Sequence, residues 1–534
     1  MFVTANSAFR PGAALVLSLV ALVMAGPPVV ADDQAGLVIR STTRLVQMSV
    51  IVQDKQGRPV VDLKKEDFEV LDNGKLRPLT LFVVEAPGIA VQPQSVPHNT
   101  FTNQFARTTG ARSGYAVIVL DWLNTPWSDQ TRARQQVVQM LKRIEQNDRI
   151  ALYVLDRRLK VINEFSDDRA TLLEKIAKLR VDPGVLLDVQ TGSVSDASVS
   201  SPGGPSSVGP TGPSHPAFDL PKDEEVFQLD QRVQETLQAF QVIADHLATV
   251  PGRKILIWVS AGFPLNIDSS DVDVGIRSQG DYATQIGRTI QKLNNADVAV
   301  YPVDARGLTL GSSAYDTIWT MKEFASRTGG LAWYNRNDLD VGVRNALDDV
   351  RFSYTIGFSP PEEAKYGSHK VRVKVRRAGV TLRYRDGYYL DEPGNSQVQD
   401  QRAEVVRAML SPVDSTAIPI TVRAARKQDI LMSQMSLDAG GLDLVLEADR
   451  WQGKLELQAC FEAAAGRRIG SIITQVVEIN MRPQTHDAAL RNGLAFRVAL
   501  PIPPDAAALK LLVWDVRSGK IGTLSIPLKM MMSN

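Results

Sequence analysis

The segment Tyr115-Ala-Val-Ile-Val-Leu-Asp-Trp-Leu-Asn-Thr125 contains the clearest fold signal in the chain. Its first six residues form a continuous apolar run, which is typical of a strand covered on both faces of a sheet. The run ends at Asp121. Two apolar residues, Trp122 and Leu123, separate it from the polar pair Asn124-Thr125. Ligands of open parallel sheets bind where the strands end. The segment therefore predicts a buried parallel strand with a candidate site at its carboxyl end.

Helix-like and strand-like patterns alternate after this strand. Amphipathic stretches predict helices, and the apolar runs between them predict strands. The helices are expected at about 129–146, 172–179, 226–250, 282–294, 316–327 and 338–349, and the strands at 150–155, 255–259, 298–303 and 331–334. This alternation predicts a parallel, doubly wound α/β domain at 113–350. Residues 192–216 are mostly Ser, Gly and Pro, which predicts a disordered insert within that domain.

Strand-like patterns flank the α/β region on both sides. Alternating apolar residues and turn motifs predict an N-terminal β-sandwich module at 37–86, followed by a linker at 87–112. Short strands are also expected within 351–391. Isolated sheets of two or three strands are marginally stable in water, so we expect 37–86 and 351–391 to pack into one sandwich. Residues 404–530 predict a second β-sandwich domain. The fold class is thus multidomain, an α/β domain flanked by β-sandwich modules.

The N-terminus has the layout of a secretory signal peptide. An apolar run spans 13–26, and Val29 and Ala31 supply small residues before a cleavage site at Asp32. We expect residues 1–31 to be removed and the protein to be exported to the periplasm, cell envelope or extracellular space. The alternative is a retained N-terminal anchor. No later segment reaches 18 uninterrupted apolar residues, so no integral membrane span is expected after cleavage.

Charge balance and missing motifs exclude several classes of function. The chain has 60 basic and 59 acidic residues and a net charge of +1, which argues against nucleic-acid binding and against broad binding to anionic membranes. Its single cysteine, Cys460, excludes an intrachain disulfide framework. Its five histidines lack metal-binding spacing, and the sequence contains no Walker loop, Gly-x-Ser-x-Gly elbow or Gly-x-Gly-x-x-Gly motif. We therefore do not expect an enzyme.

Three carboxylates follow predicted strands of the α/β domain. They are Asp121, Asp156 and Asp304, and they would meet at one edge of the sheet. Clustered carboxylates could hold a hard divalent cation, which prefers oxygen ligands. The alternative is that these aspartates cap loops and helices.

The loop after Asp121 also contains a candidate surface for a partner protein. It includes Trp122 and Asn124, and Trp127 follows closely. Exposed aromatic side chains suit an interface, and these three residues are the predicted partner-binding face. Packing of the two tryptophans in the core is the alternative.

Several sequence strings together resemble the von Willebrand factor A (VWA) family, and more narrowly the VWA-related proteins of the Acidobacteria. The resemblance covers about 37–390. It implies a VWA-like, Rossmann-type domain that binds partners through the upper face of its sheet. The strings are Asp67-Phe68-Glu69-Val70, Asp72-Asn73-Gly74, Leu120-Asp121 with Asn124-Thr125, Pro251-Gly252-Arg253-Lys254, Val303-Asp304-Ala305-Arg306-Gly307, Thr328-Gly329-Gly330, and Tyr354 to Phe358.

The resemblance also implies a Mg²⁺ site, from which this chain departs. The family binds the ion through an Asp-x-Ser-x-Ser loop, a distant threonine and a Thr-Asp-Gly aspartate. Asp121 matches the first ligand and Thr125 can replace the last serine, but Leu123 and Ala261 occupy positions that should supply oxygens. The distant threonine has no clear match, and Thr191 is only a guess. We therefore expect no cofactor, with Mg²⁺ as the one metal that a degenerate site could hold, helped by Asp156 or Asp304.

These features favour an exported, non-enzymatic protein that binds an unidentified protein partner in adhesion or envelope assembly. A first alternative is a structural envelope scaffold whose VWA-like face is vestigial. A second is a secreted hydrolase, which would need a nucleophile and a base near Asp121, where the sequence has no nearby Cys or His.

Overall fold

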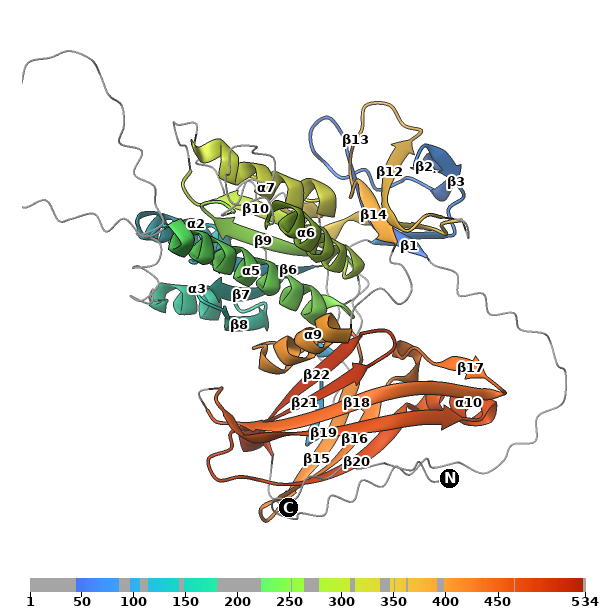
Figure 1. Ribbon diagram of the computed structural model, residues 1–534. Coiled ribbons are helices and arrows are strands. Elements are labelled where there is room, and N and C mark those ends of the chain that lie inside the picture. Colours follow the sequence, from blue (N-terminus) through green and yellow to red (C-terminus); the bar gives the residue numbers. More distant parts are fainter. Residues whose placement is uncertain are drawn as a thin grey trace, which may run out of the picture.

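The computed structural model describes residues 45–85, 97–105, 114–143, 148–179, 222–250, 252–263, 278–307, 313–336, 346–349, 351–361, 364–390, 398–464 and 466–531. The predicted signal peptide (1–31) and the predicted insert (192–216) lie outside these residues. The described strands form five sheets, and one of them has helices on both faces (Figure 1). The chain is thus a mixed α/β protein with several sheets. None of its described helices is both long enough and apolar enough to cross a membrane.

The sheet of the α/β domain contains five strands in the order β10-β9-β6-β7-β8. The first four run parallel, and β8 at the edge is antiparallel to β7. Every residue of β6, β9 and β10 is buried, as expected for strands with helices on both faces of the sheet. The strands are β6 (Tyr115–Asp121), β7 (Arg149–Leu155), β8 (Leu159–Ser166), β9 (Lys254–Ser260) and β10 (Val298–Asp304).

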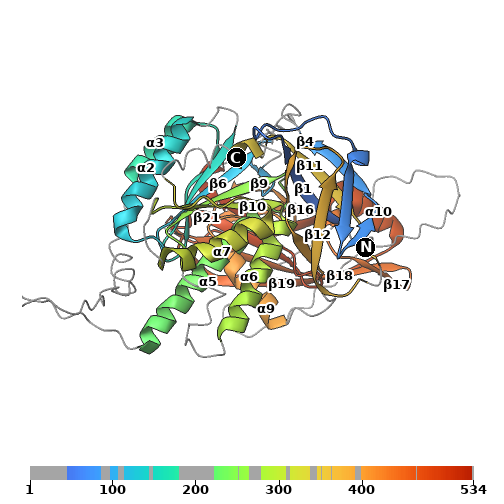
Figure 2. The same ribbon diagram turned by 90° about the horizontal axis from the view of Figure 1, so that it is seen from above.

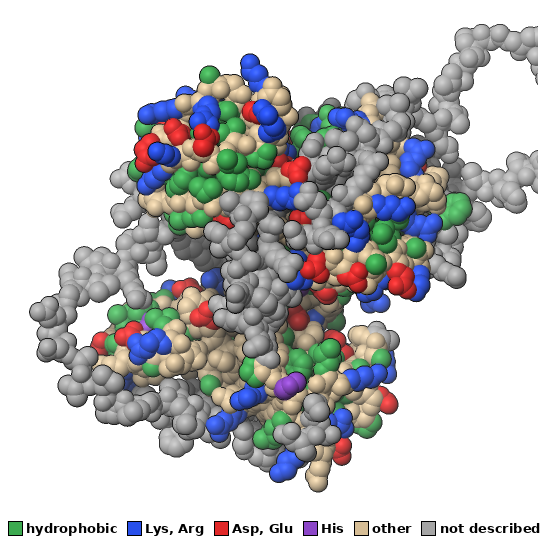
Figure 3. Space-filling view, turned by 180° about the vertical axis from the view of Figure 1, so that it is seen from behind, with side chains coloured by type: hydrophobic (Ala, Val, Ile, Leu, Met, Phe, Trp, Pro, Cys, Tyr) green, Lys and Arg blue, Asp and Glu red, His purple; other side chains and the backbone are tan. Residues whose placement is uncertain are grey.

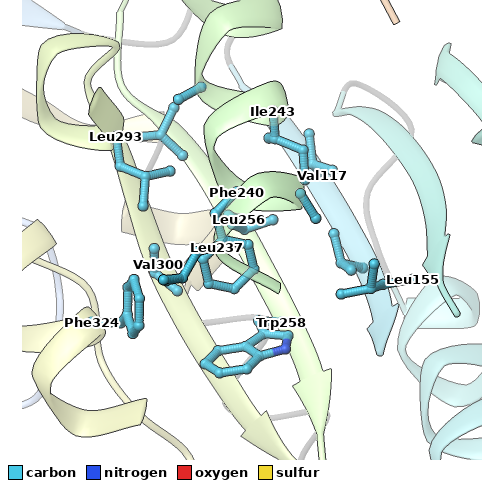
Figure 4. Close-up of a cluster of buried hydrophobic side chains, with 14 of the residues drawn as sticks. Val117, Leu155, Leu237, Phe240, Ile243, Leu256, Trp258, Leu293, Val300 and Phe324 are labelled. Carbon is cyan, nitrogen blue, oxygen red and sulfur yellow. The ribbon is translucent and has the colours of Figure 1, made fainter. Parts of the chain in front are cut away.

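Helices pack on both faces of this sheet (Figures 1 and 2). On one face, Phe240 lies with its ring centroid 5.0 Å from that of Trp258 and 5.3 Å from that of Phe324 (Figure 4). The other face has a separate apolar cluster that includes Val137 and Ile176. The first face carries α5 (Lys222–Leu247), α6 (Ser278–Asn295) and α7 (Ser313–Thr328), and the second α2 (Trp127–Arg143) and α3 (Arg169–Lys178).

The strands before and after the α/β domain share two sheets. In the first sheet, β1 (Val46–Gln53) pairs with β11 (Ser353–Phe358) and β13 (Thr381–Arg383), and β11 also pairs with β4 (Leu81–Glu85). The second has the order β14-β12-β2-β3. Both sheets contribute to one apolar cluster. The remaining strands are β2 (Phe68–Asp72), which follows the 3-10 helix η1 (Lys65–Asp67), β3 (Lys75–Arg77), β12 (Gly367–Val375) and β14 (Gly387–Leu390).

Two further sheets and α9 (Val398–Leu410) form the C-terminal part. One sheet has the order β20-β16-β15-β5, and the other has the order β17-β18-β21-β22, with β19 also paired to β18. A common apolar cluster lies between them. The elements are β5 (Thr100–Thr102), β15 (Ile420–Lys427), β16 (Ile430–Leu437), η2 (Ala439–Gly441), β17 (Val445–Glu447), β18 (Arg450–Glu462), β19 (Arg468–Met481), α10 (Pro483–Asn492), β20 (Leu494–Pro501), β21 (Ala508–Asp515), β22 (Ile521–Pro527) and η3 (Leu528–Met530).

Three details differ from the sequence-based expectations. The predicted linker (87–112) is wrong at Thr100–Thr102, because β5 pairs with β15 in the C-terminal sheet. The antiparallel edge strand β8 was not predicted, since most of its side chains are only partly buried and give no clear apolar pattern. The strand predicted at 331–334 is an isolated bridge between Trp333 and Val303. Short pairings of this kind depend on tertiary partners and leave little trace in sequence.

Candidate functional site

The loop at the carboxyl end of β6 is centred on Asp121, which is fully buried. Its Oδ1 accepts the backbone N–H of Asn124 at 3.0 Å. Its Oδ2 accepts the side-chain amide of Asn124, the indole N–H of Trp258 and the hydroxyl of Ser260, each at 2.9 Å. Both oxygens of the carboxylate are therefore engaged by donors from the loop and from β9.

Helix α5 completes this polar cluster. The side-chain Nδ2 of Asn124 also donates to Thr236 Oγ1 at 2.8 Å, and its side-chain Oδ1 accepts the Nε–H of Arg232 at 3.2 Å. Burial lowers the pKa of Arg232, and the nearby charge of Asp121 opposes that shift. Asn124 thus connects the β6 loop to a helix that lies more than a hundred residues later in the chain.

The electrostatics of Asp121 are set by burial and by its donors. Burial raises the pKa of Asp121 above its ordinary value, and the hydrogen bonds from Asn124, Trp258 and Ser260 oppose that shift. A carboxylate that is fully removed from water requires such donors. The arrangement suits a structural role that holds the loop against β9.

The other positions of the VWA metal motif supply few oxygens here. Thr125 is fully buried, and its Oγ1 accepts the backbone N–H of Ala261 at 3.1 Å. The side chains of Leu123 and Ala261 contain no oxygen. An ion that bound Asp121 would have to displace donors that the carboxylate already uses. Within the described residues, no group of three or more His, Cys, Asp or Glu side chains is arranged to hold a metal. The residues in place do not fit a complete VWA-type site.

The two other candidate carboxylates bind basic residues two to four positions later in the chain. Asp156 forms an ion pair with Lys160 and accepts the backbone N–H of Arg158 at 3.3 Å. Asp304 accepts the backbone N–H and Nε of Arg306 at 3.0 Å each, and also Nη2 at 3.2 Å. Such contacts are typical of aspartates that stabilise turns.

The predicted partner-binding face is only partly exposed. Trp122 and Asn124 are buried, with 2% and 4% of their surface accessible, so neither can present a side chain to a partner. The loop folds inward because the N–H of Leu123 donates to the carbonyl of Leu155 at 3.0 Å. Trp127, the first residue of α2, is 56% exposed. Of the three residues, Trp127 alone remains a candidate for a partner contact.

Several members of the site were not identified from the sequence. Trp258 looks like an ordinary apolar residue of a buried strand, and Arg232 and Thr236 lie on a helix whose position is set by tertiary packing. The one available signal was the polar residue Ser260 at the end of β9, opposite Asp121 across the sheet.

Comparisons with known proteins give only remote structural similarity. No protein-family model and no curated protein sequence matches the chain. Similar solved structures include a von Willebrand factor type A protein from Catenulispora acidiphila, at 9% identity and TM-score 0.22, over 92% of this chain and 74% of that one. The type V pili tip protein Mfa5 from Porphyromonas gingivalis matches at 10% identity and TM-score 0.25, over 91% of this chain and 78% of that one. An aerotolerance-related membrane protein from Bacteroides fragilis matches at 9% identity and TM-score 0.24, over 44% of this chain and 98% of that one. Scores this low imply nothing about function.

Proposed function

We propose that this chain is an exported protein that binds another protein in adhesion or envelope assembly, through a VWA-like domain that lacks a complete metal-ion-dependent adhesion site. In this proposal the doubly wound VWA-like domain is inserted into one β-sandwich and followed by another, and residues 1–31 direct export. The sequence resemblance to VWA-related proteins of the Acidobacteria supports the same assignment.

The observation that carries the proposal is the engagement of Asp121 by Asn124, Trp258 and Ser260. A side chain that exchanges metal ions needs free oxygen lone pairs and access to water. The buried carboxylate instead joins the β6 loop to β9 through hydrogen bonds. This supports a rigid upper edge of the sheet, on which neighbouring exposed side chains can make partner contacts.

Trp127 is the best candidate for such a contact. Its indole is largely exposed at the start of α2, a rigid element next to the Asp121 loop. Large aromatic side chains dominate the binding energy of many interfaces. On the face shown in Figure 3, basic and acidic side chains are interspersed over the described residues, without a field of one sign. This favours recognition by apolar and shape-specific contacts over charge attraction.

Affinity capture from an envelope extract tests the proposal. The full chain is compared with Trp127→Ser and with Tyr366→Ser, a matched control in which Tyr366 is 50% exposed, each in EDTA and in Mg²⁺. We expect a specific partner to be retained in EDTA, and Trp127→Ser to reduce its capture by at least about tenfold. Release of the partner by EDTA would contradict the metal-independent mechanism. Equal capture by both variants would favour the scaffold with a vestigial VWA face.

A further inference from the structure

His246 lies at a junction between the α/β domain and the C-terminal part, which we call the C-terminal joint. It is the penultimate residue of α5 and only 5% exposed. On the C-terminal side, the backbone N–H of Thr416 donates to the carbonyl of Asp245 at 2.9 Å, and Thr416 Oγ1 accepts the N–H of Thr249 at 3.1 Å. Figure 1 shows α5 ending close to α9 and the C-terminal sheets. The end of α5 is thus fixed to the segment between α9 and β15.

The imidazole of His246 contacts both sides of this joint. Its Nδ1 lies 2.7 Å from the carbonyl oxygen of Asp414, in the segment before β15. Its ring stacks on that of Phe105, with centroids 4.9 Å apart, and Phe105 stacks on Phe165 of β8 at 5.1 Å. Phe105 follows β5, a strand of the C-terminal sheet. A single side chain therefore touches segments from two parts of the protein.

The protonation state of the ring follows from these contacts. A carbonyl oxygen can only accept a hydrogen bond, so Nδ1 must carry a proton. In the neutral ring Nε2 is then a bare acceptor, and it is buried without a hydrogen-bond partner. The carboxylate oxygen Oε2 of Glu164 lies 3.6 Å from Nε2. The lone pair of a neutral Nε2 makes no favourable interaction with the carboxylate of Glu164, whereas a protonated Nε2 is attracted to it as a cation.

The charged groups that act on the ring of His246 are the acidic residues Glu164 and Asp414. Glu164 on β8 also accepts the hydroxyl of Tyr153 at 3.3 Å. The carboxylate of Asp414 accepts the N–H and the hydroxyl of Ser525 at 2.9 Å each. Asp245 on α5 itself lies 3.5 Å from Lys292 of α6, and the charges of Glu404 and Arg407 on α9 also act on it. Segment 97–105 contributes the aromatic ring of Phe105.

We propose that the C-terminal joint is a pH-sensitive contact. Protonation of His246, favoured by Glu164 on the neighbouring strand β8, makes Nδ1–H a charge-assisted donor to the carbonyl of Asp414 and so strengthens the attachment of the α/β domain to the C-terminal part. Burial lowers the pKa of His246. The hydrogen bond and charge of Glu164 and the carbonyl and charge of Asp414 raise the pKa by more than burial lowers it, so the net shift is upward. A raised folded-state pKa means that the added stability is complete below about 6.5, the unfolded value. It is lost as the pH rises through the folded-state value.

Hydrogen–deuterium exchange of the full chain between pH 5.5 and 9 tests this proposal. Protection of peptides covering 97–105 and 411–416 is corrected for intrinsic exchange and normalised to peptides of β9. We expect wild-type protection to fall at least about fivefold as the pH rises. His246→Gln should abolish this pH dependence. Glu164→Gln leaves the histidine in place and alters a side chain that is 55% exposed, so it should move the transition to lower pH without unfolding the protein.

The matched control is Glu174→Gln, because Glu174 is an exposed acidic residue of α3 with no contact to the joint. It should leave the wild-type transition unchanged. A wild-type profile without pH dependence would overturn the proposal. So would a transition that survives unchanged in both His246→Gln and Glu164→Gln.

Discussion

The indole N–H of Trp258 donates a 2.9 Å hydrogen bond to Oδ2 of Asp121, across neighbouring parallel strands of the central sheet. Both side chains are fully buried. The bond joins the end of β6 to the interior of β9, and the same oxygen accepts the hydroxyl of Ser260. The carboxylate of Asp121 is thus part of the internal structure of the domain.

Replacing Asp121 should therefore reduce stability. Asp121→Ala removes the acceptor of four buried donors, of which the Ser260 hydroxyl can still donate to the carbonyl of Gly262. The loss should lower the free energy of unfolding by about 3–5 kcal/mol. Urea denaturation followed by tryptophan fluorescence measures this change. Glu66→Ala, at an exposed position in η1, should change stability by less than about 0.5 kcal/mol. A small effect of Asp121→Ala would show that its donors find other partners.

Magnesium should have little effect on the folded protein. An ion that binds only the folded state raises stability by about 2.7 kcal/mol at a hundredfold excess over its Kd. With Leu123 and Ala261 in ligand positions, we expect millimolar Mg²⁺ to shift the melting temperature no more than NaCl of equal ionic strength does. Differential scanning fluorimetry checks this. A Mg²⁺ or Mn²⁺ stabilisation that disappears in Asp121→Ala would restore metal-dependent binding as the mechanism.

Lys254, the first residue of β9, should make the free energy of unfolding change with pH in the alkaline range. Lys254 is 3% exposed, and its Nζ donates to the carbonyl of Val250 at 2.7 Å. Burial lowers its pKa to about 8, although the charges of Asp297 and Glu85 oppose that shift. Between about pH 8 and the unfolded value of about 10.4, the unfolded chain binds more protons. Wild-type stability should therefore rise with pH in this window, relative to Lys254→Met.

Urea denaturation of both proteins at pH 7, 8.5 and 10 gives the comparison. Lys55→Met, at an exposed turn, is the matched control and should follow the wild type at each pH. A constant difference between wild type and Lys254→Met would mean that Lys254 keeps the same charge in the folded and unfolded chains.

The N-terminal strands should not fold by themselves. Strand β1 has both of its neighbours, β11 and β13, in the later segment, and β2 pairs with β12. A fragment of residues 36–90 lacks these partners and should show no cooperative thermal transition by circular dichroism. A fragment of 113–350, which contains the whole central sheet, should show one. Cooperative melting of 36–90 alone would mean that its strands form a different sheet in isolation.

The sequence predicts the central strands of this fold and says less about how they are connected to the rest. Uninterrupted apolar runs such as 115–120 occur because both faces of the sheet are covered, so burial is visible in the sequence itself. Asp121 could be located for the same reason, as the polar residue at the end of such a run. The contact of Asp121 with Trp258 could not be predicted, because a tryptophan in a buried strand looks like any other apolar residue until the register of the two strands is known.

Long-range contacts explain the other differences. Phe105 and β5 lie in a stretch that reads as a linker, and their role depends on β15, far along the chain. His246 has the sequence context of an ordinary helical residue. Its neighbours Glu164 and Asp414 come from separate parts of the fold. Patterns of apolar periodicity describe single helices and strands, so they carry no information on contacts between residues that are far apart in the sequence.

The sharing of sheets between distant strands has a consequence for the order of events during synthesis. Strand β1 ends at Gln53 and its partner β11 begins at Ser353, so at 5–20 residues per second roughly 15–60 s pass between their translation. During that interval the apolar side of β1 has no partner strand and is open to wrong associations. Strand β1 is thus exposed well before its partner β11 is made. A binding factor that covers residues 46–85 in the meantime would raise the yield of folded protein.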